Sequence, residues 1–272
     1  MANIIRSSKC GSDWCQNDLT AYNISVVLKT DSADFFGLPV TDIEPSIDAT
    51  VMSFDYDSDY TNMQPKHTRN LIRFMDLATT APEESTVDEF ANRLLVAMDY
   101  DSGDTMVQSR KVIPLLSCGI YTVAQTDVCV MRGVLPILLM IQEDKTILNP
   151  KDPEPQVIAE AIAAFQTNNR ILRDLGFNTL NRMVIPCVTM VGTFPHFYLV
   201  PVTTELSMGV KVGTYPSEET VVTKHIPAIP WRMSKGMKNL RNRKCILKCF
   251  EAFKHFVDEL DVQLGVMPLV GY

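Results

Sequence analysis

The sequence has no apolar run long enough to cross a bilayer and no apolar segment near its beginning. The longest uninterrupted apolar stretch runs from Val134 to Ile141, whereas a transmembrane helix needs roughly 18 residues. Residues 1–10, Met-Ala-Asn-Ile-Ile-Arg-Ser-Ser-Lys-Cys, do not contain the apolar core of a secretory signal. We therefore expect an intracellular protein, cytoplasmic or nuclear, that is neither secreted nor bound in a membrane.

The motifs of several enzyme classes are also missing. The sequence contains no glycine-rich phosphate loop, no Gly-x-Ser-x-Gly turn and no His-Glu-x-x-His pair. Each of these patterns places backbone donors, a nucleophile or metal ligands at a fixed spacing that its chemistry requires. Their absence argues against a kinase, a dinucleotide-dependent dehydrogenase and a serine hydrolase.

Cysteine is present, but without the spacing of a metal site. None of the seven cysteines has a partner at the two-residue spacing of a zinc knuckle. An odd number of cysteines without a secretory signal indicates reduced thiols. Cys245 and Cys249 are one turn apart on an expected helix, where we interpret them as small buried side chains, with structural zinc as the alternative.

Basic residues are unevenly distributed. The chain has 25 Lys and Arg against 32 Asp and Glu, a net charge of −7, which argues against coating nucleic acid through bulk charge. No basic residue lies between Lys29 and Lys66. One run free of acids supplies the candidate nucleic-acid contacts: Arg232, Lys235, Lys238, Arg241, Arg243 and Lys244. This run either follows a phosphate backbone, with Trp231 and Phe250 stacking on bases, or forms the solvated face of the last helix.

The two parts of the chain differ in the clarity of their patterns. Residues 1–80 form an N-terminal region with a strand at Ile24–Leu28, a short helix at Arg69–Leu77 and an acidic, loop-like extension between them. In residues 81–272, segments with the apolar period of a helix alternate with segments typical of strands, which predicts one domain. Its expected elements are a helix (85–98), three strands (106–116, 119–131, 135–144), a helix (153–175), two strands (183–191, 196–202), about 30 loop-like residues with Pro216, Pro227 and Pro230, and a helix (235–260). This order predicts an α/β fold with a mixed central sheet flanked by helices.

Charged side chains gather where the most apolar strand ends. Gln142-Glu143-Asp144-Lys145 follows directly on that strand, and strand alternation places Glu143 and Lys145 on the same side. Asp127 is the only charge in the preceding apolar segment, and Gln156 and Glu160 are one turn apart on the next helix. An acid and a lysine at the mouth of a buried strand are costly to desolvate without a partner. A divalent cation would be such a partner.

These residues make the chain resemble the PD-(D/E)XK nuclease superfamily. An acid on one strand followed by Glu-x-Lys on its neighbour, in the order helix, three strands, helix, strand, is the pattern of that superfamily, and it covers residues 84–202. The sequence around residues 141–145 and 155–166 is also similar to uncharacterised intracellular fungal proteins. The resemblance implies a restriction-endonuclease-like αβββαβ core.

The resemblance also implies a site. Asp127, Glu143 and the backbone carbonyl of Asp144 would hold Mg²⁺ or Mn²⁺, Lys145 would orient or deprotonate the attacking water, and Gln156 would hold that water or Lys145. Glu89, or else Glu84, corresponds to the acid that some members place on the first helix. Residue 126 is Thr where the motif has Pro.

Asp127 and Glu143 can come close to each other only under one geometric condition. A symmetric hairpin around Arg132-Gly133 would set Asp127 opposite Leu139, roughly 13 Å along the strand from Glu143 at about 3.3 Å per residue. The two acids converge only if the loop is asymmetric or a bulge bends a strand.

The expected function is Mg²⁺-dependent hydrolysis of phosphodiester bonds in DNA or RNA. A second interpretation is a catalytically inactive nuclease-fold module that binds nucleic acid or protein, because folds host many functions. A third is a structural α/β protein in which Glu143 and Lys145 form an ordinary surface ion pair.

Overall fold

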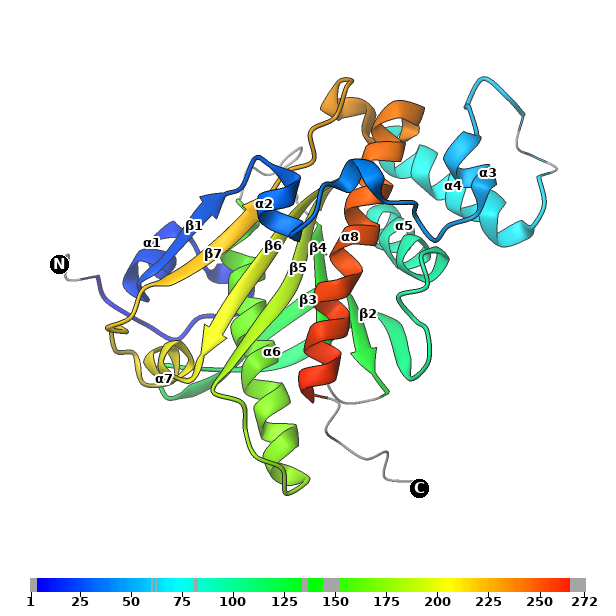
Figure 1. Cartoon of the computed structure of the whole chain (residues 1–272). Coiled ribbons are helices and arrows are strands. Elements are labelled where there is room, and N and C mark those ends of the chain that lie inside the picture. The colour runs from blue at the N-terminus through cyan, green and yellow to red at the C-terminus, as the bar shows by residue number, and fades with distance from the viewer. Residues whose placement is uncertain are drawn as a thin grey trace.

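A seven-stranded mixed sheet forms the centre of the molecule (Figure 1). The computed structural model describes residues 4–59, 61, 63–80, 83–133, 137–143 and 152–264, with the backbone alone at residues 142 and 143. The strand order is β1-β7-β6-β5-β4-β3-β2. The strands are β1 (Ile24–Leu28), β2 (Thr105–Ser117), β3 (Ile120–Arg132), β4 (Ile137–Glu143), β5 (Arg182–Val191), β6 (Phe194–Thr203) and β7 (Thr220–His225).

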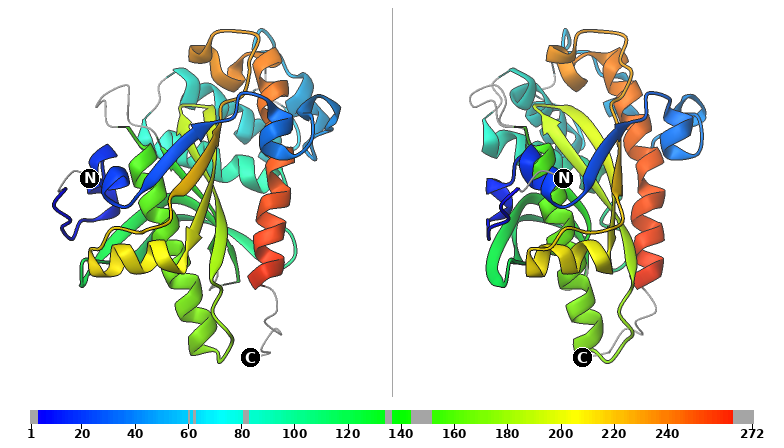
Figure 2. Two further views of the ribbon diagram at one scale, coloured as in Figure 1. Left: turned by 60° about the vertical axis from the view of Figure 1, so that its left-hand side comes forward. Right: turned by 90° about the vertical axis from the view of Figure 1, so that its left-hand side faces the viewer.

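Helices cover both faces of this sheet, and in Figure 2 the sheet lies between α6 and α8. We call these two sides the α6 face and the α8 face. Within the described ranges, no helix is both long enough and apolar enough to span a membrane. The α-helices are α1 (Gln16–Ala21), α2 (Ser32–Phe36), α3 (Ala49–Ser53), α4 (Lys66–Thr80), α5 (Glu84–Ala97), α6 (Glu154–Asp174), α7 (Thr204–Val212) and α8 (Leu240–Leu264). Three 3₁₀ turns are η1 (Gly11–Asp13), η2 (Val40–Asp42) and η3 (Met233–Lys238).

The apolar run of β4 explains its central position. Residues 137–141 are at most 2% exposed, as expected for a strand covered by helices on both faces. β4 pairs antiparallel with β3 and parallel with β5, and α6 forms the crossover between β4 and β5. The carboxyl ends of β4 and β5 therefore lie at the same edge of the sheet as the N-terminus of α6. We call this the carboxyl edge; it is the upper edge in Figure 1.

The predicted order of elements from residue 81 is confirmed, and so is the α/β fold with a mixed sheet flanked by helices. The expectation of a long loop before the last helix is wrong. That segment contains α7 and the short strand β7, which pairs with both β6 and β1. The spaced prolines suggested a loop, yet they lie outside both elements.

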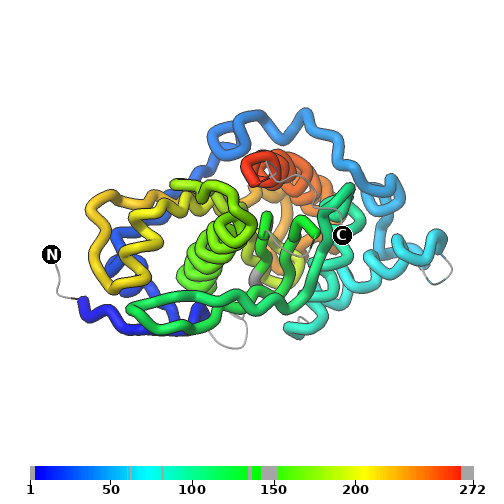
Figure 3. Tube along the Cα trace, turned by 90° about the horizontal axis from the view of Figure 1, so that it is seen from below, coloured from blue at the N-terminus to red at the C-terminus, as the bar shows by residue number. Residues whose placement is uncertain are grey.

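The acidic N-terminal segment is folded onto the rest of the protein. β1 is confirmed and forms one edge of the sheet. The segment expected to be loop-like contains α2, η2 and α3, and Figure 3 shows it crossing over α8. Glu251 of α8 accepts hydrogen bonds from the backbone N–H of Ser46 at 2.8 Å and from its hydroxyl at 3.0 Å. Lys248 donates to the Thr41 carbonyl at 2.6 Å.

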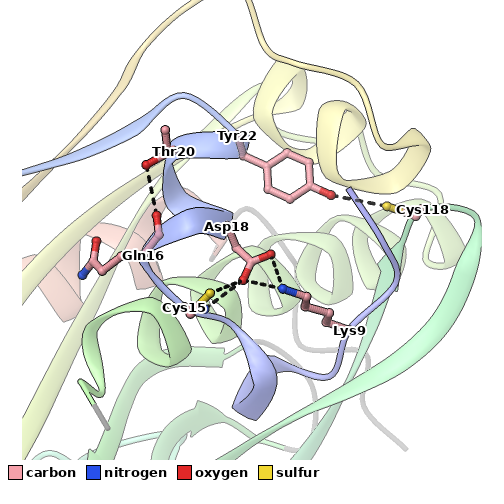
Figure 4. Close-up of polar contacts among 7 residues, drawn as sticks. All are labelled: Lys9, Cys15, Gln16, Asp18, Thr20, Tyr22 and Cys118. Carbon is pink, nitrogen blue, oxygen red and sulfur yellow. Dashed lines mark hydrogen bonds and ion pairs between the residues drawn. The ribbon is translucent and has the colours of Figure 1, made fainter. Parts of the chain in front are cut away.

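Polar contacts also hold the first helix in place (Figure 4). Asp18 accepts hydrogen bonds from the Lys9 ammonium at 2.8 and 2.9 Å and from the backbone N–H of Cys15 at 2.9 Å. The Tyr22 hydroxyl lies 3.4 Å from the Cys118 sulfur in the turn between β2 and β3. The pKa of Tyr22 is raised because the phenol is buried and hydrogen-bonded to Cys118. These contacts join the start of the chain to the far end of the β2–β3 hairpin.

Arg243 anchors the N-terminal segment to α8 from inside the core. It is 0% exposed, and its guanidinium donates to the backbone carbonyls of Phe54 and Met237. The prediction that Arg243 contacts nucleic acid is therefore wrong, because its charged group faces the protein interior. Burial lowers the pKa of Arg243, and the negative charges of ionised Tyr56 and Asp55 partly offset this effect.

We predict that Arg243→Ala destabilises the protein by about 2–4 kcal/mol, because it leaves a cavity and two carbonyl groups without their donor. The exposed neighbour Arg241 provides the control, and Arg241→Ala should change the free energy of unfolding by no more than about 0.5 kcal/mol. Urea unfolding followed by circular dichroism measures both. Equal midpoints for the two variants would contradict the anchoring role.

Candidate active site

Asp127 lies on β3 opposite the last residues of β4. Val128 pairs with Ile141, and the register shifts at a bulge nearer the turn between the two strands. One step further along β3, Asp127 falls opposite residue 142. The hairpin is therefore asymmetric, and the condition for bringing Asp127 close to the end of β4 is met.

The backbone is distorted on the other side of Asp127. Pairs between β2 and β3 form on both sides of this position, but the pair between Arg110 and Asp127 is missing from the ladder. Arg110 has a positive φ of 55°, a left-handed conformation that costs a non-glycine residue roughly 1–2 kcal/mol. Backbone strain of this kind is concentrated at functional sites. Asp127 thus occupies the point where the regular sheet is interrupted.

Asp127 lies on the α6 face, because it points to the same side of β3 as Cys129, whose pKa is raised by Glu160 of α6. Residues directly opposite each other in an antiparallel pair share a face, so Val128 and Ile141 point to the other side from Asp127. A site shared by Asp127 and Glu143 therefore requires β4 to leave its regular alternation after Ile141. The side chain of Glu143 and all of residues 144–151 lie outside the described part of the chain, and the roles of Glu143, Asp144 and Lys145 stay predictions.

Glu160 of α6 is a buried acid whose pKa is affected by the charge of Asp127. The buried face of α6 is otherwise almost entirely apolar, and Glu160 on that face is 0% exposed. Gln156, one turn earlier, donates a hydrogen bond from Nε2 to Glu160 Oε1 at 3.1 Å. Within the described residues, Glu160 Oε2 is buried without a hydrogen-bond partner. Asp127 itself is 6% exposed.

Burial raises the pKa of Glu160 well above its usual range. The charge of Asp127 adds to this effect, and the hydrogen bond from Gln156 opposes it. The pKa of the Cys129 thiol is raised to about 12 because that group is buried as well, and Glu160 contributes. Burial and the charge of Asp127 thus both favour the protonated form of Glu160.

A row of polar side chains continues across the α6 face at the carboxyl edge. Thr189 of β5 pairs with residue 142 of β4, and Tyr198 of β6 pairs with Lys224 of β7. The Lys224 ammonium lies 3.0 Å from a Glu154 carboxylate oxygen and 5.1 Å from the centre of the Tyr198 ring. This ion pair joins the first turn of α6 to β7, so it fixes the end of the helix that carries Gln156.

The predicted basic residues separate into four groups. Arg232 and Lys235 are exposed, in and just before η3. η3 packs on the turn between β5 and β6, where the Met237 N–H donates to the Thr193 hydroxyl at 2.9 Å. These two cations therefore lie at the carboxyl edge, as Figure 1 shows for η3.

The remaining members of that run are ion-paired, buried or on α8. Lys238 is 2.6 Å from an Asp76 carboxylate oxygen and forms an ion pair with it. Arg241 and Lys244 are exposed on α8, and Lys244 lines a separate cavity that includes Cys245. Arg243 is buried, as described above.

The helical acid that the resemblance assigned to α5 does not join Asp127. Glu89 forms an ion pair with Arg93 and lines a cavity of about 410 Å³ among α3, α4 and α5, together with Asp48 and His67. Glu84 is exposed at the first residue of α5. The acid beside Asp127 comes from α6 instead.

Within the described ranges, no group of three or more His, Cys, Asp and Glu side chains could hold a metal ion. Asp127 and Glu160 provide two carboxyl groups. Two protein carboxylates are a common complement for Mg²⁺, which keeps several of its waters.

No family model and no curated protein matches this chain. The resemblance to the PD-(D/E)XK superfamily therefore rests on the residues and the element order alone.

Sequence patterns led to the prediction of Asp127 and Gln156 as site residues but did not reveal the burial of Glu160. The sequence did contain an indication of this burial, because Glu160 follows Gln156 by one turn and is surrounded by Ala and Ile. A lone acid within an apolar helical stripe is the pattern that could have identified it. No sequence pattern indicated that Tyr198 and Lys224 lie near α6, because this proximity follows from the order of the strands in the sheet.

The raised pKa of Glu160 predicts that stability falls as pH rises. Above the usual glutamate pKa of about 4.3, the unfolded chain loses a proton that the folded chain keeps. The free energy of unfolding then decreases by up to about 1.4 kcal/mol per pH unit, until the pH passes the folded-state pKa. Glu160→Gln removes this titration, so the variant should gain stability relative to the wild type as the pH rises above the usual glutamate pKa of about 4.3.

Urea unfolding in EDTA at several pH values measures this difference. Glu259→Gln, at an exposed position of α8, is the matched control and should follow the wild-type profile. A constant difference between Glu160→Gln and the wild type across the pH range would show that Glu160 is ionised in the folded protein.

Proposed function

We propose that this protein is a metal-dependent nuclease with a PD-(D/E)XK-like, restriction-endonuclease-like core. The element order α5-β2-β3-β4-α6-β5 supports this proposal, since three antiparallel strands are followed by a helical crossover to a parallel strand. Open α/β sheets bind their ligands outside the carboxyl ends of the strands. The polar groups described above lie at that edge.

The proposal rests chiefly on one observation, the buried pair of Asp127 and Glu160. Glu160 is unfavourable as an anion at this position, because burial and the charge of Asp127 both raise its pKa. A divalent cation would allow both groups to be ionised. Glu160 Oε2, buried and without a hydrogen-bond partner among the described residues, fits that need, since Mg²⁺ and Mn²⁺ prefer carboxylate oxygen.

Each residue of the site then has a distinct role. Asp127 and Glu160 would hold Mg²⁺ or Mn²⁺. When bound, the cation would polarise the phosphate that is cleaved and lower the pKa of a water molecule. Gln156 orients Glu160 through the 3.1 Å hydrogen bond to Oε1, which leaves Oε2 for the cation. Glu143, the carbonyl of Asp144 and Lys145 keep the roles that the sequence resemblance gives them.

The substrate is nucleic acid, DNA or RNA. Arg232 and Lys235 are exposed at the same edge of the sheet as the acid pair, where they would contact phosphates on either side of the bond that is cleaved. With a net charge of −7 over the whole chain, such contacts are local. We therefore expect affinity to depend on these few cations and to fall as salt is raised.

Thermal denaturation with and without Mg²⁺ or Mn²⁺ tests the metal site. The metal should raise the melting temperature of the wild type, and Asp127→Asn should abolish that rise because one ligand is lost. Asp34→Asn, at an exposed position on α2, is the matched control and should keep the full rise. An unchanged rise in Asp127→Asn would place the metal elsewhere.

Cleavage of fluorescent single-stranded and duplex DNA and RNA tests the activity. Asp127→Asn, Glu160→Gln, Glu143→Gln and Lys145→Met should each lower the rate at least about 100-fold, as expected for groups that act on the transition state. Nuclease activity that survives Asp127→Asn and Glu160→Gln would exclude hydrolysis at this site. Binding of nucleic acid without cleavage by the wild type would instead support the inactive nuclease-fold module.

A further inference from the structure

A cavity of about 420 Å³ lies at the carboxyl edge of the sheet. Its walls come from the turn between β5 and β6, the end of α4 and η3. Ligand pockets in proteins have volumes of roughly 300–1,000 Å³. The cavity is therefore large enough for a small heterocyclic ligand.

A fixed hydrogen-bond network forms one wall of this cavity. The hydroxyls of Thr79 and Thr193 are 3.0 Å apart, and Thr193 accepts a hydrogen bond from the Met237 N–H at 2.9 Å. Gly236 has a positive φ of 41° and passes so close to Thr193 that a Cβ at this position would overlap its hydroxyl. The segment around η3 is thereby held against the β5–β6 turn, and the wall exists before any ligand arrives.

His196 supplies the polar group that is left without a partner. Within the described residues, its Nε2 is buried and forms no hydrogen bond, and the side chain lines the cavity. A ligand that reached this nitrogen would supply the missing partner. Burial lowers the pKa of His196 to about 4, with Lys224 lowering it further and Asp152 raising it. The imidazole is therefore neutral, with one donor and one acceptor nitrogen. The Phe194 ring meets it edge-on at 5.7 Å.

This chemistry fits a nucleobase better than a phosphate. A neutral imidazole, hydroxyl groups and an aromatic ring can hydrogen-bond and stack on a planar neutral heterocycle. A phosphate would need positive charge, and the nearby Lys224 is already paired with Glu154 at 3.0 Å. The cavity therefore differs in character from the basic surface beside it.

The cavity is also within reach of the polynucleotide that the proposed site would cleave. His196 pairs with Thr189, Thr189 pairs with residue 142, and Asp127 lies on the next strand. Three strand spacings of about 4.8 Å each place His196 about 14 Å from Asp127. Trp231 is 54% exposed just before η3, where it can stack on a neighbouring base.

We propose that this cavity binds one unstacked base of the substrate strand, close to the bond that is cleaved. The inference rests on the proposed nuclease function for its substrate, but base binding is measured separately from cleavage. It makes single-stranded nucleic acid, or a duplex with an extruded nucleotide, the preferred substrate, because a stacked and paired base cannot enter a closed pocket.

Binding is tested with the full chain in EDTA, so that no cleavage occurs. The probe is a short single-stranded DNA that carries 2-aminopurine at one position, moved along the oligonucleotide in a series. At one position the fluorescence should change on binding. His196→Phe, which keeps the volume but removes both nitrogens, and Ser234→Phe, which fills the cavity from an exposed lining position, should each weaken binding roughly 10-fold. Ser58→Phe, in an exposed turn, is the matched control and should bind like the wild type.

An abasic nucleotide at the responsive position identifies the group that is bound. It should weaken binding of the wild type by the same factor, and His196→Phe should then cause no further loss, because both changes remove the same interaction. Additive losses, or equal binding by His196→Phe and Ser58→Phe, would overturn the base-binding proposal even if the protein cleaves DNA or RNA. Base-dependent binding by a protein that cleaves neither would leave the pocket in place and remove the nuclease proposal.

Discussion

The packing of α6 against the sheet is the interaction on which the candidate site depends. The helix buries its apolar stripe over the central strands, and its crossover makes β4 and β5 parallel, so that their carboxyl ends meet at one edge. The same packing removes Glu160 from water and holds it near Asp127. Apolar burial of this kind stabilises a helix by far more than one buried carboxyl group costs. The fold thus tolerates a buried acid at a position where the burial of a carboxyl group alone would be unfavourable.

The parts of the fold that follow from local pattern were predictable from the sequence. The apolar run at residues 137–141 indicated a central strand, and the alternation around it indicated the neighbouring strands. The bulge between β3 and β4 was not predictable, because its position is decided by how the twisted strands pack. β7 was missed although it begins with four β-branched residues, Thr-Val-Val-Thr. The prolines on either side of it suggested a loop.

The candidate site was predictable to a similar extent. Asp127 was identifiable as the lone charge of an apolar strand, and Gln156 by its place at the start of the next helix. Arg243 was misassigned because a run of basic residues suggests a surface. It lies three, four and seven residues before Ile246, Leu247 and Phe250, which are all buried. The helical periodicity therefore indicated that Arg243 lies on the core face of α8, but the run of basic residues led us to predict a surface position instead.

The left-handed residue Arg110 has a consequence for the outer edge of the sheet. β2 is an edge strand of 13 residues with Met106 and Val112 exposed, and a long regular edge of this kind invites pairing with another copy of the chain. At Arg110 the backbone turns away from the extended conformation, which interrupts the row of amide and carbonyl groups that a second strand would need. The distortion opposite Asp127 thus also protects the protein against edge-to-edge aggregation.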